Sequence, residues 1–281
     1  MPAELPDADA LVREVGWNQT KADWQIFLDL GTVRAIRDQG RVIATAATLP
    51  YGGRFGWISM VLVSAAHRRQ GIATRLLLRC RDELVAAGLV PVLDATPAGR
   101  KLYPALGFED AWGYHRFKGE APRGAATDFS QNDVPGGGVS ISAIADTDWG
   151  ELCAYDAQAF GADRGALLAR MRGRLPPAEL VARRNGKVAG FLLGRDGGRI
   201  MQVGPLVGEH DMIAQALLAR AFAALPGPVY LDFADSKTDL RLWLEGLGFS
   251  AERALTRMIY KRSERFDDPV RTFAVVGPEF G

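Results

Sequence analysis

Residues 59–78 constrain the fold more than any other stretch, because an apolar run, a polar turn and an amphipathic helix follow one another there. The run Met60–Val63 is short and apolar, which is typical of a buried strand. Five apolar residues then recur at helical spacing, namely Ile72, Leu76, Leu77, Cys80 and Leu84. These patterns predict a strand–turn–helix unit and, with it, an α/β fold.

The turn of this unit is predicted to bind an anion. The first N–H groups of a helix lack intrahelical acceptors, and the helix dipole favours negative charge there. Gly71 allows close approach to the backbone and Ala73 leaves the helix start uncrowded, while Arg68 and Arg69 add positive charge. The nucleotide loops G-x-x-x-x-G-K-[ST] and G-x-G-x-x-G are both absent. A basic surface turn before a core helix is the alternative interpretation.

Two motifs carry a family resemblance. The turn Arg68-x-x-Gly71-x-Ala73 resembles the pyrophosphate loop, Gln/Arg-x-x-Gly-x-Gly/Ala, of the GNAT superfamily of acetyl-CoA-dependent N-acetyltransferases. Residues 94–108 resemble that family's later motif, a strand and a short helix ending Tyr-x-x-x-Gly-Phe, here Tyr103 to Phe108. The two motifs stand in the family's order, about thirty residues apart.

The resemblance implies acetyl-CoA (coenzyme A) as cofactor and Tyr103 as the catalytic residue, a general acid near the thioester sulfur. This sequence differs from the family at Thr96, where the family often has an Asn that contacts the pantetheine arm. The Thr96 hydroxyl can still form a hydrogen bond. The cofactor-binding residues that it implies are Val61, Leu62, Val63, Arg68, Arg69, Gln70, Gly71, Ile72, Ala73, Thr74, Thr96, Gly99 and Tyr103.

The resemblance also implies transfer of acetyl to a primary amine by direct attack in a ternary complex. No serine or cysteine nucleophile motif is present, and the apolar face predicts a buried Cys80. Polyamine, amino acid, aminoglycoside and protein N-terminus all remain open as the small-molecule or peptide acceptor. Residues placed where such acceptors bind are Trp17, Asn18, Tyr51, Arg54 and Trp57, although aromatic residues are ordinary core residues too. A non-catalytic acyl-CoA-binding regulator and a purely structural pair of domains are the alternatives.

The pattern repeats after a stretch rich in glycine and proline. The sequence predicts an acetyl-CoA-binding GNAT domain over 1–118, a linker over 119–138, a degenerate GNAT-like domain over 139–262 and a tail with a strand over 263–281. Each domain is expected to be a mixed twisted β-sheet flanked by helices. The second copy has Glu209 and Asp211 at the turn, which would repel a pyrophosphate, and Leu244 in place of the tyrosine. One cofactor site is therefore predicted.

Two further features depend on the repeat. Asp94 could act as a base, but Asp232 matches it in the copy without a cofactor turn, which favours a role in bracing the strand end. The tail segment 270–277 reads as a strand between two prolines. Because the first domain has no clear opening strand, we expect this segment to pack against or pair with that domain. Pairing inside the second domain is the alternative.

Composition limits the partners. The net charge is +1, which predicts neither nucleic-acid binding nor a membrane surface. The two cysteines lie far apart in the chain, and neither a signal peptide nor an apolar membrane span is recognisable, so we expect a cytoplasmic protein without disulfides. We expect it to be a monomer or a homodimer. The histidines His67, His115 and His210 lack metal-ligand spacing, so no metal is expected.

Overall fold

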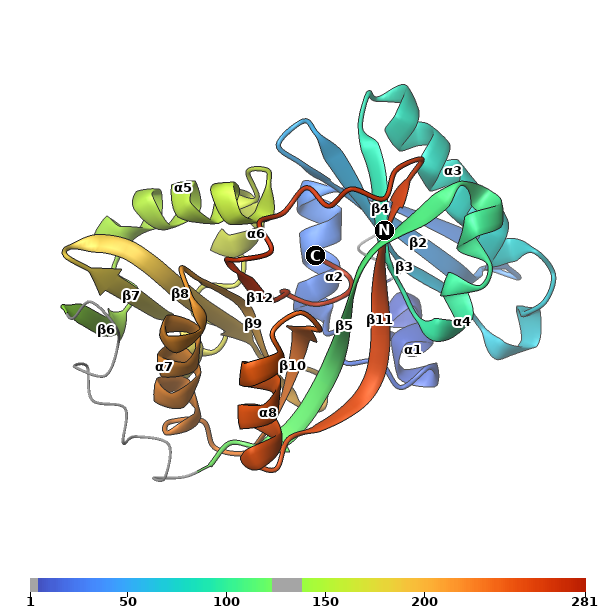
Figure 1. Cartoon of the computed structure of the whole chain (residues 1–281). Coiled ribbons are helices and arrows are strands. Elements are labelled where there is room, and N and C mark those ends of the chain that lie inside the picture. Colours follow the sequence, from blue (N-terminus) through green and yellow to red (C-terminus); the bar gives the residue numbers. More distant parts are fainter. Residues whose placement is uncertain (1–4, 123–137) are drawn as a thin grey trace.

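The computed structural model describes residues 5–122 and 138–281. Within these ranges, strands form one mixed sheet in the order β1-β2-β3-β4-β11-β5-β10-β12-β9-β8-β7-β6. Figure 1 shows two halves side by side, each a twisted part of this sheet covered by helices. The α/β fold with two tandem domains is therefore confirmed, although the two sheets are joined into one.

The first half begins with two helices and continues as strands around one long helix. Its elements are α1 (Leu5–Glu14), α2 (Lys21–Leu30), β1 (Thr32–Asp38), β2 (Arg41–Tyr51), β3 (Phe55–Val63), α3 (Ile72–Ala86), β4 (Val90–Ala95), α4 (Pro97–Arg100) and β5 (Phe108–Glu120). Short 3-10 helices lie at Ala65–His67 and Tyr103–Leu106.

The second half repeats this order with a strand in front. Its elements are β6 (Val139–Ala143), α5 (Trp149–Phe160), α6 (Gly165–Ala169), β7 (Leu180–Arg184), β8 (Lys187–Arg195), β9 (Met201–Gly208), α7 (Asp211–Phe222), β10 (Pro228–Ala234), α8 (Thr238–Gly246), β11 (Ser250–Tyr260) and β12 (Thr272–Ala274). Short 3-10 helices lie at Asp146–Asp148 and Pro176–Ala178.

The two halves exchange their long closing strands. Strand β11 of the second half lies between β4 and β5 of the first, and β5 in turn lies between β11 and β10. These long strands run through the junction in Figure 1. Each half therefore completes the sheet of the other, and separating them would leave strand edges unpaired on both sides.

Two buried ion pairs join the exchanged strands. Asp94 on β4 accepts two hydrogen bonds of 2.9 Å from Arg257 on β11. Arg116 on β5 donates bonds of 2.8 and 2.7 Å to Asp232 on β10. Each bidentate pair takes its carboxylate from one half and its guanidinium from the other. Both aspartates thus brace strands, as the repeat predicted.

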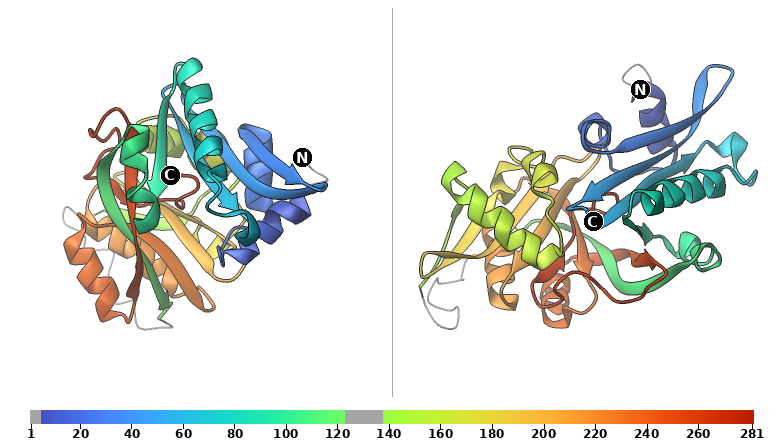
Figure 2. Two further views of the ribbon diagram at one scale, coloured as in Figure 1. Left: turned by 90° about the vertical axis from the view of Figure 1, so that its right-hand side faces the viewer. Right: turned by 90° about the horizontal axis from the view of Figure 1, so that it is seen from above.

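Helices cover both faces of the sheet (Figure 2). A central core joins apolar side chains of α1, α2, α5 and α6, so it belongs to both halves. Helix α3 covers the other face of the first half, and α7 with α8 covers the other face of the second. The halves share a core as well as a sheet, and none of the helices in the described ranges has the length and hydropathy needed to cross a membrane.

The tail enters the second half before it reaches the first. Strand β12 pairs with β9 and, through Ala274, with β10. Pairing with the first domain was therefore the wrong expectation, because β9 and β10 diverge and offer two strand edges close by. The following residues do pack on the first half: Phe280 stacks on Phe27 at 5.1 Å, and the Tyr51 hydroxyl donates to the Phe280 carbonyl at 2.6 Å.

The predicted linker lies mostly outside the described residues, since only 119–122 and 138 of it are described. Of these, 119 and 120 belong to β5. Helix α1 begins at Leu5, the first described residue, and β1 forms one edge of the sheet.

Candidate active site

The first half opens between β3 and β4. These strands pair in parallel only from Phe55–Trp57 to Val90–Val92. Beyond that point β4 remains paired only along its other edge, with β11, and β3 and β4 diverge. A cavity of about 150 Å³ lies in the opening, lined by residues of β3, β4, β5, β11, the loop after α1 and the tail.

A bulge in β3 shapes one wall of the cavity. Pairing shifts between Thr45–Leu62 and Ala47–Ser59, so two residues of β3 oppose one of β2. Met60 in this bulge has a φ of 52°, and its carbonyl accepts the Thr45 hydroxyl at 2.9 Å. Such bulges re-aim backbone groups, and positive φ at a non-glycine residue is concentrated at functional sites.

The turn after β3 presents backbone amides to solvent. Arg69 and Gly71 both adopt left-handed conformations, with φ of 61° and 72°. Helix α3 then begins at Ile72 with Gly71 at its N-cap, so no side chain caps its first N–H groups. An added Cβ at Gly71 would meet no atom within 4 Å. Consecutive amides of this kind form an anion-binding nest at a helix N-terminus.

Most side chains of the turn face outward. Residues Arg69, Gln70, Gly71, Ala73 and Thr74 are exposed. By contrast, the side chains of Leu62 and Ile72 are buried in the cores on opposite faces of the sheet, so they can contact a cofactor only through the backbone.

Arg68 and the two valines complete this side of the site. The Arg68 Nε donates to the Val63 carbonyl at 3.1 Å, and one of its terminal nitrogens lies 3.5 Å from Glu14. This arginine thereby ties the turn to the end of β3. Val61 lines the cavity, while Val63 is half-buried at the start of the turn.

The second motif places a phenol at the cavity. The Thr96 hydroxyl accepts the Gly99 N–H at 3.3 Å and caps α4, and both Thr96 and Tyr103 line the cavity. A Cβ at Gly99 would lie 2.8–3.0 Å from the Tyr103 ring and hydroxyl, so glycine makes room for the phenol. Burial raises the pKa of Tyr103, which keeps its hydroxyl protonated and able to act as an acid.

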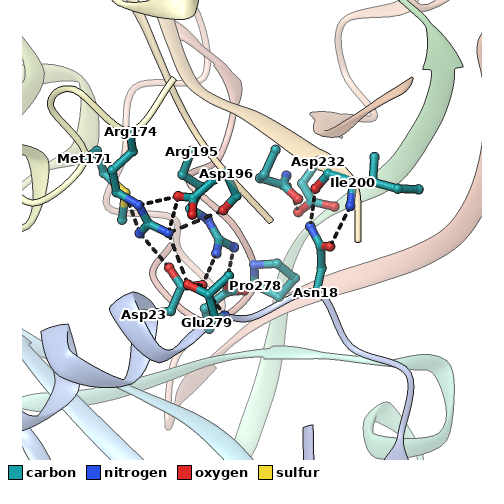
Figure 3. Close-up of polar contacts among 12 residues, drawn as sticks. Asn18, Asp23, Met171, Arg174, Arg195, Asp196, Ile200, Asp232, Pro278 and Glu279 are labelled. Atoms are coloured by element: carbon teal, nitrogen blue, oxygen red, sulfur yellow. Dashed lines mark hydrogen bonds and ion pairs between the residues drawn. The ribbon is translucent and has the colours of Figure 1, made fainter. Parts of the chain in front are cut away.

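Of the predicted acceptor residues, only Trp17 lines this cavity. The Asn18 side chain donates to the Ile200 carbonyl at 2.7 Å and accepts the Arg199 and Ile200 N–H groups at 3.1 Å, which joins the halves (Figure 3). These contacts assign Asn18 a structural role.

Tyr51, Arg54 and Trp57 also serve the junction instead of the cavity. Tyr51 and Trp57 are buried, and both bind carbonyl groups of the tail. The Arg54 guanidinium donates to the Gly161 carbonyl in the second half. Tyr51 and Trp57 therefore belong to the packing surface between the halves and not to the cavity, since aromatic residues suit both places equally well.

Several polar residues of the cavity were not predicted from the sequence. Arg116 lies on the exchanged strand β5, and Arg253 and Glu279 come from β11 and the tail. Gln19 and Ser59 are buried beside them. Nothing in the sequence signalled Arg253 and Glu279, because strand exchange brings the first, and the packing of the tail brings the second, to a cavity of the first half. No group of three His, Cys, Asp or Glu side chains within the described ranges is arranged to hold a metal ion.

Comparison with known proteins agrees with this geometry. A model of the acetyltransferase (GNAT) family matches residues 6–108, and a model of an acetyltransferase (GNAT) domain matches residues 152–274. An uncharacterised N-acetyltransferase of Bacillus subtilis, YitH, is 23% identical over 256 residues, which cover 90% of this chain and 86% of that protein.

Solved structures share the fold. A Pyrococcus horikoshii protein assigned as an acetyltransferase superposes with a TM-score of 0.75 at 19% identity, covering 100% of this chain and 94% of its own. A tandem GNAT protein from the clavulanic acid biosynthesis pathway gives 0.64 at 15% identity, covering 92% and 94%. With two GNAT models matching its two halves, the chain belongs to the GNAT acetyltransferases and carries two GNAT domains in tandem.

Proposed function

We propose that this protein transfers an acetyl group from acetyl-CoA to a primary amine by direct attack in a ternary complex, at a single site in its first half. One observation carries the proposal: β3 ends in a turn of exposed backbone amides, and residues 58–61 of the same strand line, together with the Tyr103 phenol, the cavity at the opening between β3 and β4. Family membership supports the reaction class.

The residues present fit the cofactor. The turn 68–74 would bind its pyrophosphate through backbone amides, with Gly71 leaving the approach free. The end of β3 and Thr96 would contact its pantetheine arm. When bound, acetyl-CoA supplies an activated acetyl thioester.

The reaction requires the protein to position the two substrates and to supply one proton to the leaving sulfur. The attacking nitrogen forms a C–N bond as the C–S bond breaks, and the departing sulfur needs a proton. Tyr103 would supply it and be reprotonated from solvent, while the nitrogen releases its own proton to solvent. General acid catalysis of this kind contributes roughly 100- to 10,000-fold to a rate.

Direct attack is supported by the state of the cysteines. Cys80 is completely buried, and burial raises its pKa to about 12. Burial also raises the pKa of Cys153, which lies in the second half on α5. Neither thiol therefore has the lowered pKa that marks a cysteine nucleophile.

The test pairs a binding titration with a turnover assay. Calorimetry should give one equivalent of acetyl-CoA per chain, and thiol release should depend on an added amine. Two equivalents would contradict the assignment of a single site. Binding without turnover on any amine would favour a non-catalytic acyl-CoA-binding regulator, and absence of binding would contradict the cofactor site itself.

A further inference from the structure

Four buried polar atoms around the cavity have no hydrogen-bond partner in the described parts of the chain. They are Gln19 Oε1, Ser59 Oγ, Arg253 Nε and Glu279 Oε2. A buried polar atom left unpaired costs about 1–3 kcal/mol, so such atoms usually have a partner in the working protein. Their convergence on one cavity indicates a ligand with both donors and acceptors.

The Glu279 carboxylate is held with one oxygen free. Its Oε1 pairs with Arg195, which also lies 2.5 Å from Asp23. Asp23 in turn binds Arg174 at 2.7 Å (Figure 3). This network fixes the carboxylate from one side and leaves Oε2 without a partner.

The backbone behind Glu279 is shaped to fit it. A Cβ on Gly277 would lie 2.9 Å from Oε2, so only glycine leaves room for the carboxylate. Glu279 itself is 3% exposed. A buried carboxylate oxygen without a donor is a site for a cation, and an ammonium group supplies both the charge and the hydrogen bonds.

Arg253 is a candidate anion site in the same cavity, complementary to the cation site at Glu279. No ion pair neutralises it among the described residues, whereas nearby Arg116 is fully engaged by Asp232. Burial and then the charge of Arg116 lower the pKa of Arg253, so its environment penalises the positive charge. An anion placed beside it would relieve this penalty.

The cavity continues toward further positive charge. Arg253, Arg116 and Trp17 also line a neighbouring cavity of about 240 Å³, together with the exposed Arg199 and with Glu252. A ligand that extends from the thioester site in this direction therefore meets three guanidinium groups and one carboxylate, which already pairs with Lys118 at 3.6 Å.

We propose that the acceptor is an amine that also carries a carboxylate, as an amino acid does, with its ammonium at Glu279 and its carboxylate at Arg253. This inference rests on the proposed acetyl transfer. A polyamine would place a second ammonium beside Arg253, which like-charge repulsion opposes. Both anchors belong to the second half or the tail, so the copy without a cofactor turn supplies acceptor specificity to the other copy.

The experiment compares amino acids with the amines that remain when their carboxylate is removed: lysine with cadaverine, phenylalanine with phenethylamine, and leucine with isoamylamine. Full-length protein should show a kcat/KM at least roughly tenfold higher for a carboxylate-bearing acceptor than for its counterpart. Arg253→Gln should abolish this preference without changing acetyl-CoA affinity, and Arg253→Lys should restore part of it. Glu279→Gln should instead raise KM for both members of a pair.

Lys118→Gln is the matched control. Lys118 lies on β5 and lines neither cavity, although its partner at 3.6 Å, Glu252, lines the neighbouring one. Removing this charge should leave the preference unchanged. Equal loss of preference in Lys118→Gln and Arg253→Gln would show a general charge effect and contradict a specific anchor.

The remaining outcomes separate this inference from the proposed function. If acetyl-CoA binds and the simple amines react as well as the amino acids, or if no carboxylate-bearing acceptor reacts, the acceptor class is wrong while the cofactor site stands. If acetyl-CoA does not bind, both proposals fail.

Discussion

The two halves of this protein share one architecture and differ at the turn that would hold a nucleotide. In the first half, residues 64–71 separate β3 from α3 and include two left-handed residues. In the second, only Glu209 and His210 separate β9 from α7, and neither has a positive φ. Glu209 is engaged by Arg184, and Asp211 opens the helix. The second turn therefore lacks the length and the left-handed residues of the first, which supports the prediction that it binds no phosphate.

The halves differ equally in what fills the opening between diverging strands. Strands β9 and β10 separate as β3 and β4 do, but β12 occupies the gap. There the Val275 N–H donates to the Asp232 carbonyl at 3.0 Å, and the Gly208 N–H to the Arg271 carbonyl at 3.0 Å. Diverging strands expose backbone groups that need partners. In the second half the protein's own tail satisfies them, whereas in the first half we propose that a ligand does.

The second half also contributes to the sheet and to the cavity of the first. Its strand β11 completes the first sheet, and it contributes Arg257 to the buried pair with Asp94. With the tail it also supplies Arg253 and Glu279 to the cavity. The second half thus serves as a wall of the first half's site.

The largest effect should come from charging the first turn. Gly71→Glu should weaken acetyl-CoA binding roughly 1000-fold or more, about 4 kcal/mol, because the residue is left-handed and the new carboxylate faces the phosphates. Calorimetry measures the loss. Gly40→Glu is the matched control, since Gly40 has a φ of 82° and equally open space but lies in the β1–β2 turn. An intact affinity in Gly71→Glu would remove the turn from the site.

A second experiment tests whether the short turn or the inserted strand β12 prevents acetyl-CoA from binding to the second half. Phe273 on β12 is completely buried, so Phe273→Ala should destabilise the protein by about 3–5 kcal/mol in urea unfolding. Val270→Ala, at an exposed site on the same tail, should change stability by less than about 0.5 kcal/mol. The stoichiometry of acetyl-CoA should remain one in both variants. A second equivalent in Phe273→Ala would show that the strand alone excludes the cofactor.

A smaller effect, on kcat, is expected from removing the proposed general acid. Tyr103→Phe should keep acetyl-CoA affinity and lower kcat roughly 10- to 1000-fold. Because burial raises the pKa of Tyr103, the acid stays protonated below its shifted value, so kcat should not fall on the alkaline side until above about pH 10. Tyr260→Phe is the matched control, because Tyr260 also contacts Phe108, and its kcat should be unchanged. An unchanged kcat in Tyr103→Phe would assign the proton to water or another residue.

Local patterns in the sequence determined a large part of this protein. The apolar run, the glycine and the amphipathic helix of residues 59–84 predicted the strand, turn and helix that the structure shows. The internal repeat predicted two tandem domains, and Asp232 correctly identified Asp94 as a brace. These features depend on residues close in the chain or on the comparison of two copies, so no knowledge of long-range packing was needed.

Tertiary structure alone decided where the tail lies and which residues surround the cavity. The sequence could show that residues 270–277 suit a strand, but two edges were available, and only the divergence of β9 from β10 selected one. Likewise Tyr51 and Trp57 have the composition of an acceptor pocket, yet they are buried against the tail. Arg253 reaches the cavity because strand β11 crosses to the first half, and Glu279 because the tail packs on that half. Both placements depend on contacts between residues more than a hundred positions apart, which no local pattern records.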